Sequence, residues 1–85
     1  YERIADMLLD EGDYPAALET YGKALQIREE LAALDPDNKP RQRDLAINFD
    51  RIGDVQRYMG DTDSALLAHQ AALSIRQNLA ALDPT

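Results

Sequence analysis

The sequence predicts an all-α fold of four helices, arranged as two stacked antiparallel helical hairpins. Composition is the first observation: alanine (13) and leucine (12) far outnumber isoleucine, valine and threonine together (9) among 85 residues. This balance favours helix over sheet. The second observation is an internal repeat, and the third is apolar spacing of three and four residues within each copy.

The repeat is visible in the segment LAALDP, which occurs at 31–36 and again at 79–84. Sliding the chain by the distance between these two segments makes 17 of 37 aligned positions identical without a gap. An unrelated pair of segments would share about three. We therefore divide the single domain 1–85 into repeat 1, about 1–36, and repeat 2, about 41–85, joined by a linker at 35–40.

In repeat 1 we predict helices over 1–11 and 15–34. Apolar residues recur at helical spacing in both segments, Gly12 separates them, and Pro15 suits the first turn of the second helix. Asp35-Pro36 ends that helix, because proline cannot continue it. The short connection predicts antiparallel neighbours.

In repeat 2 we predict helices over 41–59 and 63–82. Asp37 or Asn38 can cap the first of them, Gly60 ends it, and residues 61–63 offer side-chain oxygens to the free amides of the next helix. Small residues at equivalent positions then predict that the paired helix axes approach closely; they are Ala17, Ala24, Ala65 and Ala72.

The pattern Gly-Asp-x-x-x-Ala-Leu, followed by a further Ala-Leu two helical turns on, resembles the tetratricopeptide repeat. It stands here as Gly12, Asp13, Ala17, Leu18, Tyr21, Ala24 and Leu25, and again as Gly60, Asp61, Ala65, Leu66, Ala72 and Leu73. The resemblance implies an α-solenoid segment. The period, about 48 residues against about 34 residues in the usual family repeat, resembles that of kinesin-light-chain-like and bacterial signalling arrays.

Members of this family generally bind protein or peptide partners on a concave face lined by the first helix of each repeat. The matching positions form our candidate partner-binding face: Glu2, Arg3, Asp6, Leu9, Asp10, Ile47, Asp50, Arg51, Asp54, Arg57 and Tyr58. One interpretation is an acidic or mixed-charge groove for a peptide, including a basic one. The other is a solvated helix face whose carboxylates pair with neighbouring arginines.

Other functions have little support in the sequence. The formal charge of −7 opposes binding to nucleic acid or anionic lipid, and no apolar run is long enough to span a membrane. The chain has no cysteine and a single histidine, His69, so we predict no metal, no cofactor and no enzymatic activity. We expect a cytoplasmic location.

Two alternative functions remain open at this stage. A stack without polar capping helices exposes apolar ends, which is also typical of a structural module that self-assembles into homo-oligomers by stacking or swapping. The long period also fits a sensor or autoinhibitory array beside an ATPase or protease domain in a multidomain bacterial signalling protein. In each case we expect the 85 residues to be a segment of a longer array.

Overall fold

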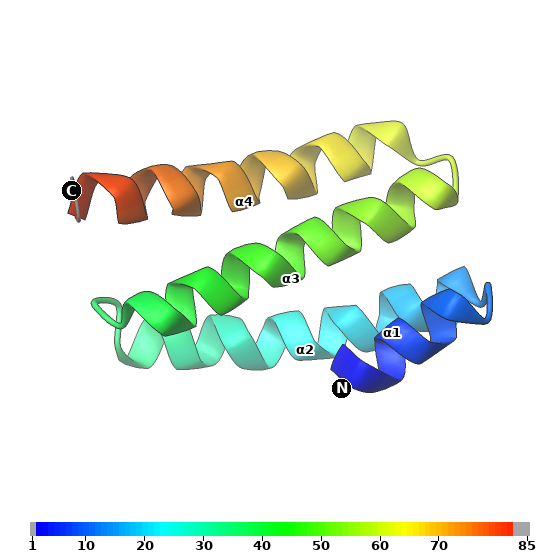
Figure 1. Cartoon of the computed structure of the whole chain (residues 1–85), viewed down its shortest axis with the longest axis horizontal. Helices are drawn as coiled ribbons and strands as arrows, with labels where there is room; N and C mark the ends of the chain where they lie inside the picture. Colours follow the sequence, from blue (N-terminus) through cyan, green and yellow to red (C-terminus); the bar gives the residue numbers. More distant parts are fainter. Residues whose placement is uncertain (1, 83–85) are drawn as a thin grey trace.

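The computed structural model describes residues 2–82, apart from the side chain of Leu82, and this part of the chain folds into four helices without a strand (Figure 1). They are α1 (Glu2–Asp10), α2 (Tyr14–Leu34), α3 (Lys39–Tyr58) and α4 (Thr62–Leu82). The all-α prediction is therefore confirmed. The parts of the predicted ranges at residue 1 and at residues 83–85 lie outside the described residues.

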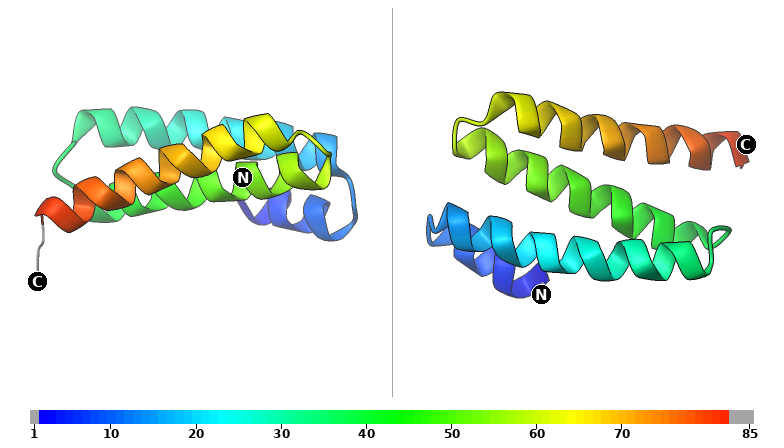
Figure 2. Two further views of the ribbon diagram at one scale, coloured as in Figure 1. Left: turned by 90° about the horizontal axis from the view of Figure 1, so that it is seen from above. Right: turned by 180° about the vertical axis from the view of Figure 1, so that it is seen from behind.

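Each helix packs mainly against the helix next to it in the chain, in the pairs α1–α2, α2–α3 and α3–α4. Consecutive helices run in opposite directions, and the long helices α2, α3 and α4 lie side by side in the views of Figures 1 and 2. The shorter α1 lies beside the first half of α2. The result is a stack of two hairpins measuring 39 × 23 × 19 Å.

One glycine ends the first helix of each hairpin. Gly12 has a φ of 81° and Gly60 a φ of 85°, in the left-handed region that other residues enter only with strain. The side chain of Asp13 then accepts a hydrogen bond from the amide of Ala16, and Asp61 accepts the equivalent bond from Ser64. Both turns thus consist of a glycine with a positive φ and an aspartate that caps the next helix, as the repeated Gly-Asp predicts.

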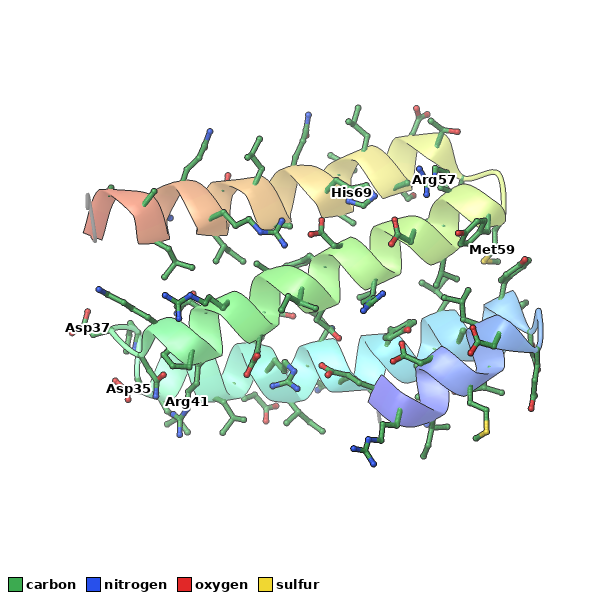
Figure 3. The ribbon with its side chains drawn as sticks, in the orientation of Figure 1. Asp35, Asp37, Arg41, Arg57, Met59 and His69 are labelled. Atoms are coloured by element: carbon green, nitrogen blue, oxygen red, sulfur yellow. The ribbon has the colours of Figure 1, made fainter. Side chains whose placement is uncertain are left out.

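Asn38, in the connection between the hairpins, caps the N-terminus of α3. Its Oδ1 accepts a hydrogen bond from the amide of Arg41, so α3 begins at Lys39, two residues before the predicted start. Arg41 also donates from its guanidinium to the carbonyl of Leu31 at 3.2 Å. Figure 3 shows Asp35, Asp37 and Arg41 together at this turn.

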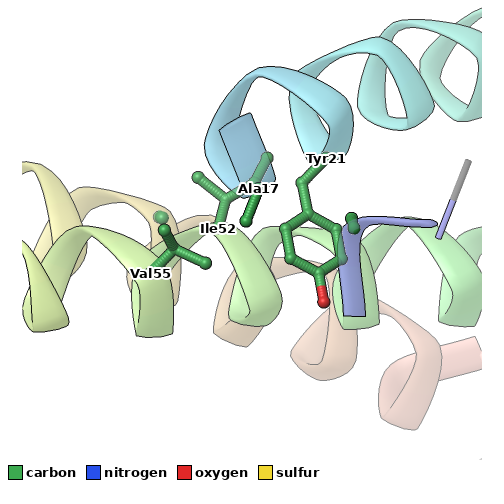
Figure 4. Packing of buried hydrophobic residues seen from close by; sticks show 6 residues of the cluster. Ala17, Tyr21, Ile52 and Val55 are labelled. Atoms are coloured by element: carbon green, nitrogen blue, oxygen red, sulfur yellow. The ribbon is translucent and has the colours of Figure 1, made fainter. Parts of the chain in front are cut away.

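A small core joins the hairpins. Ala5, Ala17 and Tyr21 come from α1 and α2, and they pack with Ile52 and Val55 of α3 (Figure 4) and with Ala68 of α4. Leu8, Leu9, Leu18 and Leu25 surround this cluster. Since the cluster contains residues of both repeats, burial of apolar surface holds one hairpin against the other.

Small residues line the contact between paired helices. Ala17, Ala24, Ala65 and Ala72 are all buried. Gly53 on α3 also lies close to α4, because an added Cβ would lie 2.7 Å from Nε2 of His69. The ring of His69 thus occupies the space that a side chain at position 53 would need.

Candidate functional site

The two hairpins carry the same ion pair at equivalent positions. Arg28 on α2 donates from Nε to Glu2 on α1 at 2.5 Å, and Arg76 on α4 donates to Asp50 on α3 at 2.6 Å. Both members of the second pair lie one repeat period after those of the first. The repeat therefore preserves a contact as well as a fold.

A second repeated contact lies one helical turn further along. The hydroxyl of Tyr21 donates to Asp6, and at the equivalent positions Nε2 of His69 lies 3.6 Å from Asp54. Burial and then the hydrogen bond to Asp6 raise the pKa of Tyr21 above its ordinary value. Tyr21 is therefore a neutral donor, and His69 replaces it as a partner for a carboxylate.

Arg28 also joins the repeats to each other. Its Nη1 lies 3.2 Å from Asp44 on α3, so one guanidinium contacts side chains on the two helices that flank α2. The hydrogen bond to Glu2 raises the pKa of Arg28 further above its already high ordinary value. A lysine would present a point charge here and would lose the planar geometry that serves both carboxylates.

Asp50 on α3 contacts two side chains of α4. Its Oδ1 lies 2.9 Å from Nδ1 of His69, while Oδ2 accepts from Arg76. Partial burial works to raise the pKa of Asp50, but the hydrogen bonds from His69 and Arg76 outweigh it and hold the pKa below its ordinary value. Figure 3 shows His69 between α3 and α4.

The end of α3 carries a small aromatic cluster. The rings of Tyr58 and Tyr14 stack with their centroids 5.6 Å apart, and the guanidinium of Arg57 lies 5.7 Å from the centroid of Tyr58. Arg57 also lies 3.6 Å from Asp54. Tyr58 remains more than half exposed, so its ring is open to a partner on one side.

The structure divides the candidate partner-binding face into three groups. Leu9 packs against the core. Five residues hold the contacts just described, namely Glu2, Asp6, Asp50, Asp54 and Arg57. The others lie at the surface: Arg3, Asp10, Ile47, Arg51 and Tyr58.

A groove of about 380 Å³ lies between the start of α1 and the second half of α2. Ala24, Ile27 and Leu31 of α2 provide its apolar surface, and charged side chains stand around them: Glu2, Arg3 and Arg28. The groove thus combines an apolar surface with charges of both signs. The apolar surface can hold an apolar side chain of a partner, and the charges can pair with charged side chains next to it in the partner.

Sequence reasoning missed the apolar part of this groove. Ala24, Ile27 and Leu31 share the repeat pattern with Ala72, Ile75 and Leu79, which favoured a place inside the helix pair. The repeat alignment alone does not separate the two sets, because it gives them equivalent positions. Only the packed helices show that Ala24, Ile27 and Leu31 line a groove together with side chains of α1.

A comparison with protein families agrees with this geometry. The family model described as tetratricopeptide repeat matches residues 1–78. The chain belongs to the tetratricopeptide repeat family. Tetratricopeptide repeats generally mediate protein–protein interaction and are typically non-enzymatic scaffolds. Searches among curated proteins and among solved structures found no match to this chain.

Two further properties of this tetratricopeptide repeat chain bear on the site. Within residues 2–82 no helix combines the length and the apolar character needed to cross a bilayer. The same part of the chain holds no group of three or more histidine, cysteine, aspartate or glutamate side chains placed to hold a metal ion.

Proposed function

We propose that the chain is a protein-interaction scaffold that binds a peptide carrying basic and apolar side chains, in a groove between α1 and α2 and on the exposed side of α3. The observation that carries the proposal is the groove lined by Glu2, Arg3, Ala24, Ile27, Arg28 and Leu31. Its apolar surface suits one or two aliphatic or aromatic side chains of a partner, which supply most of the affinity in peptide recognition.

Charge favours a basic partner. The chain carries 16 acidic and 9 basic residues, and Arg28 beside the groove is shared between Glu2 and Asp44. A negative field speeds the encounter with a positively charged peptide and disfavours an acidic one. Asp10, at the exposed end of α1, extends this negative surface.

The exposed stripe of α3 offers the second part of the surface. Ile47, Arg51 and Tyr58 recur at helical spacing and lie at the surface, so they present apolar, charged and aromatic contacts in turn. Their equivalents on α1 include Arg3 and Asp10, which lie one repeat period before Arg51 and Tyr58. The length of that period further supports membership of the long-repeat variety found in kinesin-light-chain-like arrays.

A peptide selection tests this function. A random peptide library selected against the immobilised chain should enrich sequences that combine Lys or Arg with Leu, Ile or Phe. Ile27→Lys, which places a cation on the groove surface, should weaken binding of those peptides at least tenfold. Leu34→Lys makes the same charge change on the exposed end of α2 and is the matched control.

Two results would contradict the proposal: enrichment of acidic peptides, or equal binding by the Ile27→Lys and Leu34→Lys proteins. Circular dichroism on both variants checks that each retains the helical fold. Because Ile27 and Leu34 are both exposed, neither change removes a buried contact.

Self-assembly is a second candidate function, and apolar side chains at the two ends of the stack favour it. Ile4 and Met7 on α1 and Leu66 and Leu73 on α4 are each more than half exposed.

A further inference from the structure

Arg57, near the end of α3, contacts two side chains of its own helix. Its guanidinium lies 5.7 Å from the ring centroid of Tyr58 and 3.6 Å from Asp54. Arg28 and Arg76, in contrast, each bind a carboxylate on another helix, at 2.5 and 2.6 Å. The side chain of Arg57 is also more exposed than theirs, at 63% against 30% and 49%. Its contacts are therefore loose, and their loss should disturb the packing of the helices little.

The repeat alignment separates this cluster from the contacts that form the fold. The ion pairs that join paired helices recur in both copies of the repeat. One period before Arg57, however, the chain has Leu9, and one period before Tyr58 it has Asp10. The hairpin of α1 and α2 thus forms without a tyrosine and an arginine at these positions. The two side chains on α3 are available for contact with a partner.

The ring of Tyr58 offers a prepared surface for a cation. It is 57% exposed, and it stacks on Tyr14 of α2 with the centroids 5.6 Å apart and the ring planes at 18°. Because the stacking orders the ring before a partner arrives, little conformational freedom is lost on binding. The face of an aromatic ring attracts a cation, and the position of Arg57 shows that a guanidinium can reach this ring and Asp54 together.

The charges around the two rings also favour a cation. The turns that follow α1 and α3 lie at the same end of the stack (Figures 1 and 2), and Figure 3 shows Arg57 at the end of α3 beside the second turn. In residues 7–18 and 54–66 Arg57 is the only basic residue. The acidic side chains in and beside these turns are exposed: Asp10, Glu11, Asp13, Asp61 and Asp63. Their field attracts a positively charged side chain to this end of the molecule.

We infer that Tyr14, Tyr58 and Asp54 form a binding site for an arginine side chain of the partner. In the free chain the guanidinium of Arg57 occupies this site, and the partner's guanidinium replaces it on binding. The inference rests on the proposed function, because the arginine belongs to the basic peptide of that proposal. Arginine is preferred over lysine, since a planar guanidinium can lie along a ring and donate to a carboxylate at once, whereas an ammonium is compact and strongly hydrated.

NMR titration with two small probes tests this site. Nα-acetyl-arginine amide, added at constant ionic strength, should shift the ring signals of Tyr14 and Tyr58 and the side-chain signals of Arg57. Nα-acetyl-lysine amide should bind about threefold more weakly. Equal dissociation constants for the two probes, or shifts that leave both tyrosine rings unaffected, would overturn the inference.

Variants of the ring and of the competing arginine locate the interaction. Tyr58→Leu should abolish the preference for the arginine probe, whereas Tyr58→Phe, which keeps the ring, should retain it. Arg57→Gln frees the ring, so it should strengthen binding of the arginine probe about twofold more than binding of the lysine probe. Arg43→Gln makes the same charge change at the exposed start of α3 and is the matched control, which should affect both probes equally.

Two results with these variants would contradict the site: a preference for arginine that persists in Tyr58→Leu, or weaker binding of the arginine probe by Arg57→Gln. Circular dichroism checks that each variant keeps the helical fold. In a basic peptide obtained by the selection above, replacement of arginine by lysine should weaken binding to the wild-type chain about threefold and leave binding to Tyr58→Leu unchanged.

Failure of the arginine site is distinguishable from failure of the groove. Selected peptides that respond to Ile27→Lys, together with probes that bind equally, would overturn the arginine site and leave the proposed function standing. A preference for the arginine probe that depends on Tyr58, together with equal peptide binding by Ile27→Lys and Leu34→Lys, would support the arginine site and contradict the groove.

Discussion

Asn48 on α3 donates its side-chain amide to the backbone carbonyl of Tyr21 on α2 at 3.1 Å, and both residues are fully buried. The bond crosses from one hairpin to the other. The Oδ1 of Asn48 is buried without a hydrogen-bond partner in the described structure, so the amide is held by a single bond.

Removal of this bond should destabilise the fold. We expect Asn48→Ala to lower the free energy of unfolding by about 1–3 kcal/mol, since it leaves a cavity and a carbonyl without its side-chain donor. Asn48→Asp should cost more, because it places a charge in a buried site and removes the donor. Urea denaturation at neutral pH measures both. Equal stability of the Asn48→Asp protein and the wild type would contradict the contact.

Because Gly53 and His69 lie close together, Gly53→Ala should change stability in opposite directions with and without the His69 ring. In the wild-type protein Gly53→Ala should be destabilising by about 1 kcal/mol, because the new Cβ would lie 2.7 Å from Nε2 of His69 and displace the ring from its carboxylate partners. In a His69→Ala background the same change should stabilise by up to about 1 kcal/mol through helix propensity alone. Thermal melting of the four proteins provides the measurement. The same sign in both backgrounds would show that the ring does not fill the space beside Gly53.

The two exposed glycines Gly60 and Gly22 should respond in opposite ways to alanine. Gly60 has a φ of 85°, so Gly60→Ala should destabilise by about 1–2 kcal/mol. Gly22 lies inside α2 with open space around it, so Gly22→Ala should stabilise by about 0.5–1 kcal/mol. Each change corresponds to several degrees in the melting temperature of a domain of this size. A shift in the same direction for both would contradict the turn conformation at Gly60.

The lowered pKa of Asp50 predicts that the stability of the fold depends on pH. Its pKa in the folded chain lies below the ordinary value of 3.8, so the carboxylate form stabilises the fold. That contribution is complete above the unfolded pKa and is lost as the pH falls through the lowered folded pKa. We therefore expect Asp50→Asn to lower the free energy of unfolding by about 1 kcal/mol between about pH 5 and 7, and by progressively less below about pH 4.

Urea denaturation at several pH values measures this difference, and Asp10→Asn at the exposed end of α1 is the control. The control should change stability little at any pH. A constant difference between Asp50→Asn and the wild type from about pH 7 down to about pH 3 would mean that the ion pairs of Asp50 do not contribute.

The sequence was sufficient to predict the helices and their turns, because those depend on local chemistry. Gly12 and Gly60 end helices through their backbone freedom, and Asp13 and Asp61 cap the next ones with side-chain oxygens three residues from the amides they bind. The alanines of the paired helices were also predictable, since the internal repeat places them again on the same helix face.

Pairing across helices was harder to predict. Glu2 and Asp50 were both placed on a partner-binding face, yet each contacts an arginine on the following helix, and only the packed hairpin shows that the two side chains meet. The same acid-to-arginine spacing occurs in both copies. A spacing this long does not predict a contact unless the packing of the two helices is known. The groove at Ile27 and Leu31 was missed for a related reason, since its lining combines side chains of α1 and α2 that meet only in the packed hairpin.

The packing of each helix on its neighbour along the chain has a kinetic consequence. Since the principal contacts join α1 to α2, α2 to α3 and α3 to α4, a forming contact closes only a short stretch of backbone. Chains of this topology have low contact order and fold in microseconds to milliseconds, because little loop entropy is lost before contacts reward it. Such a chain can also open from either end one helix at a time, so its outer helices should exchange their amide protons before α2 and α3 do.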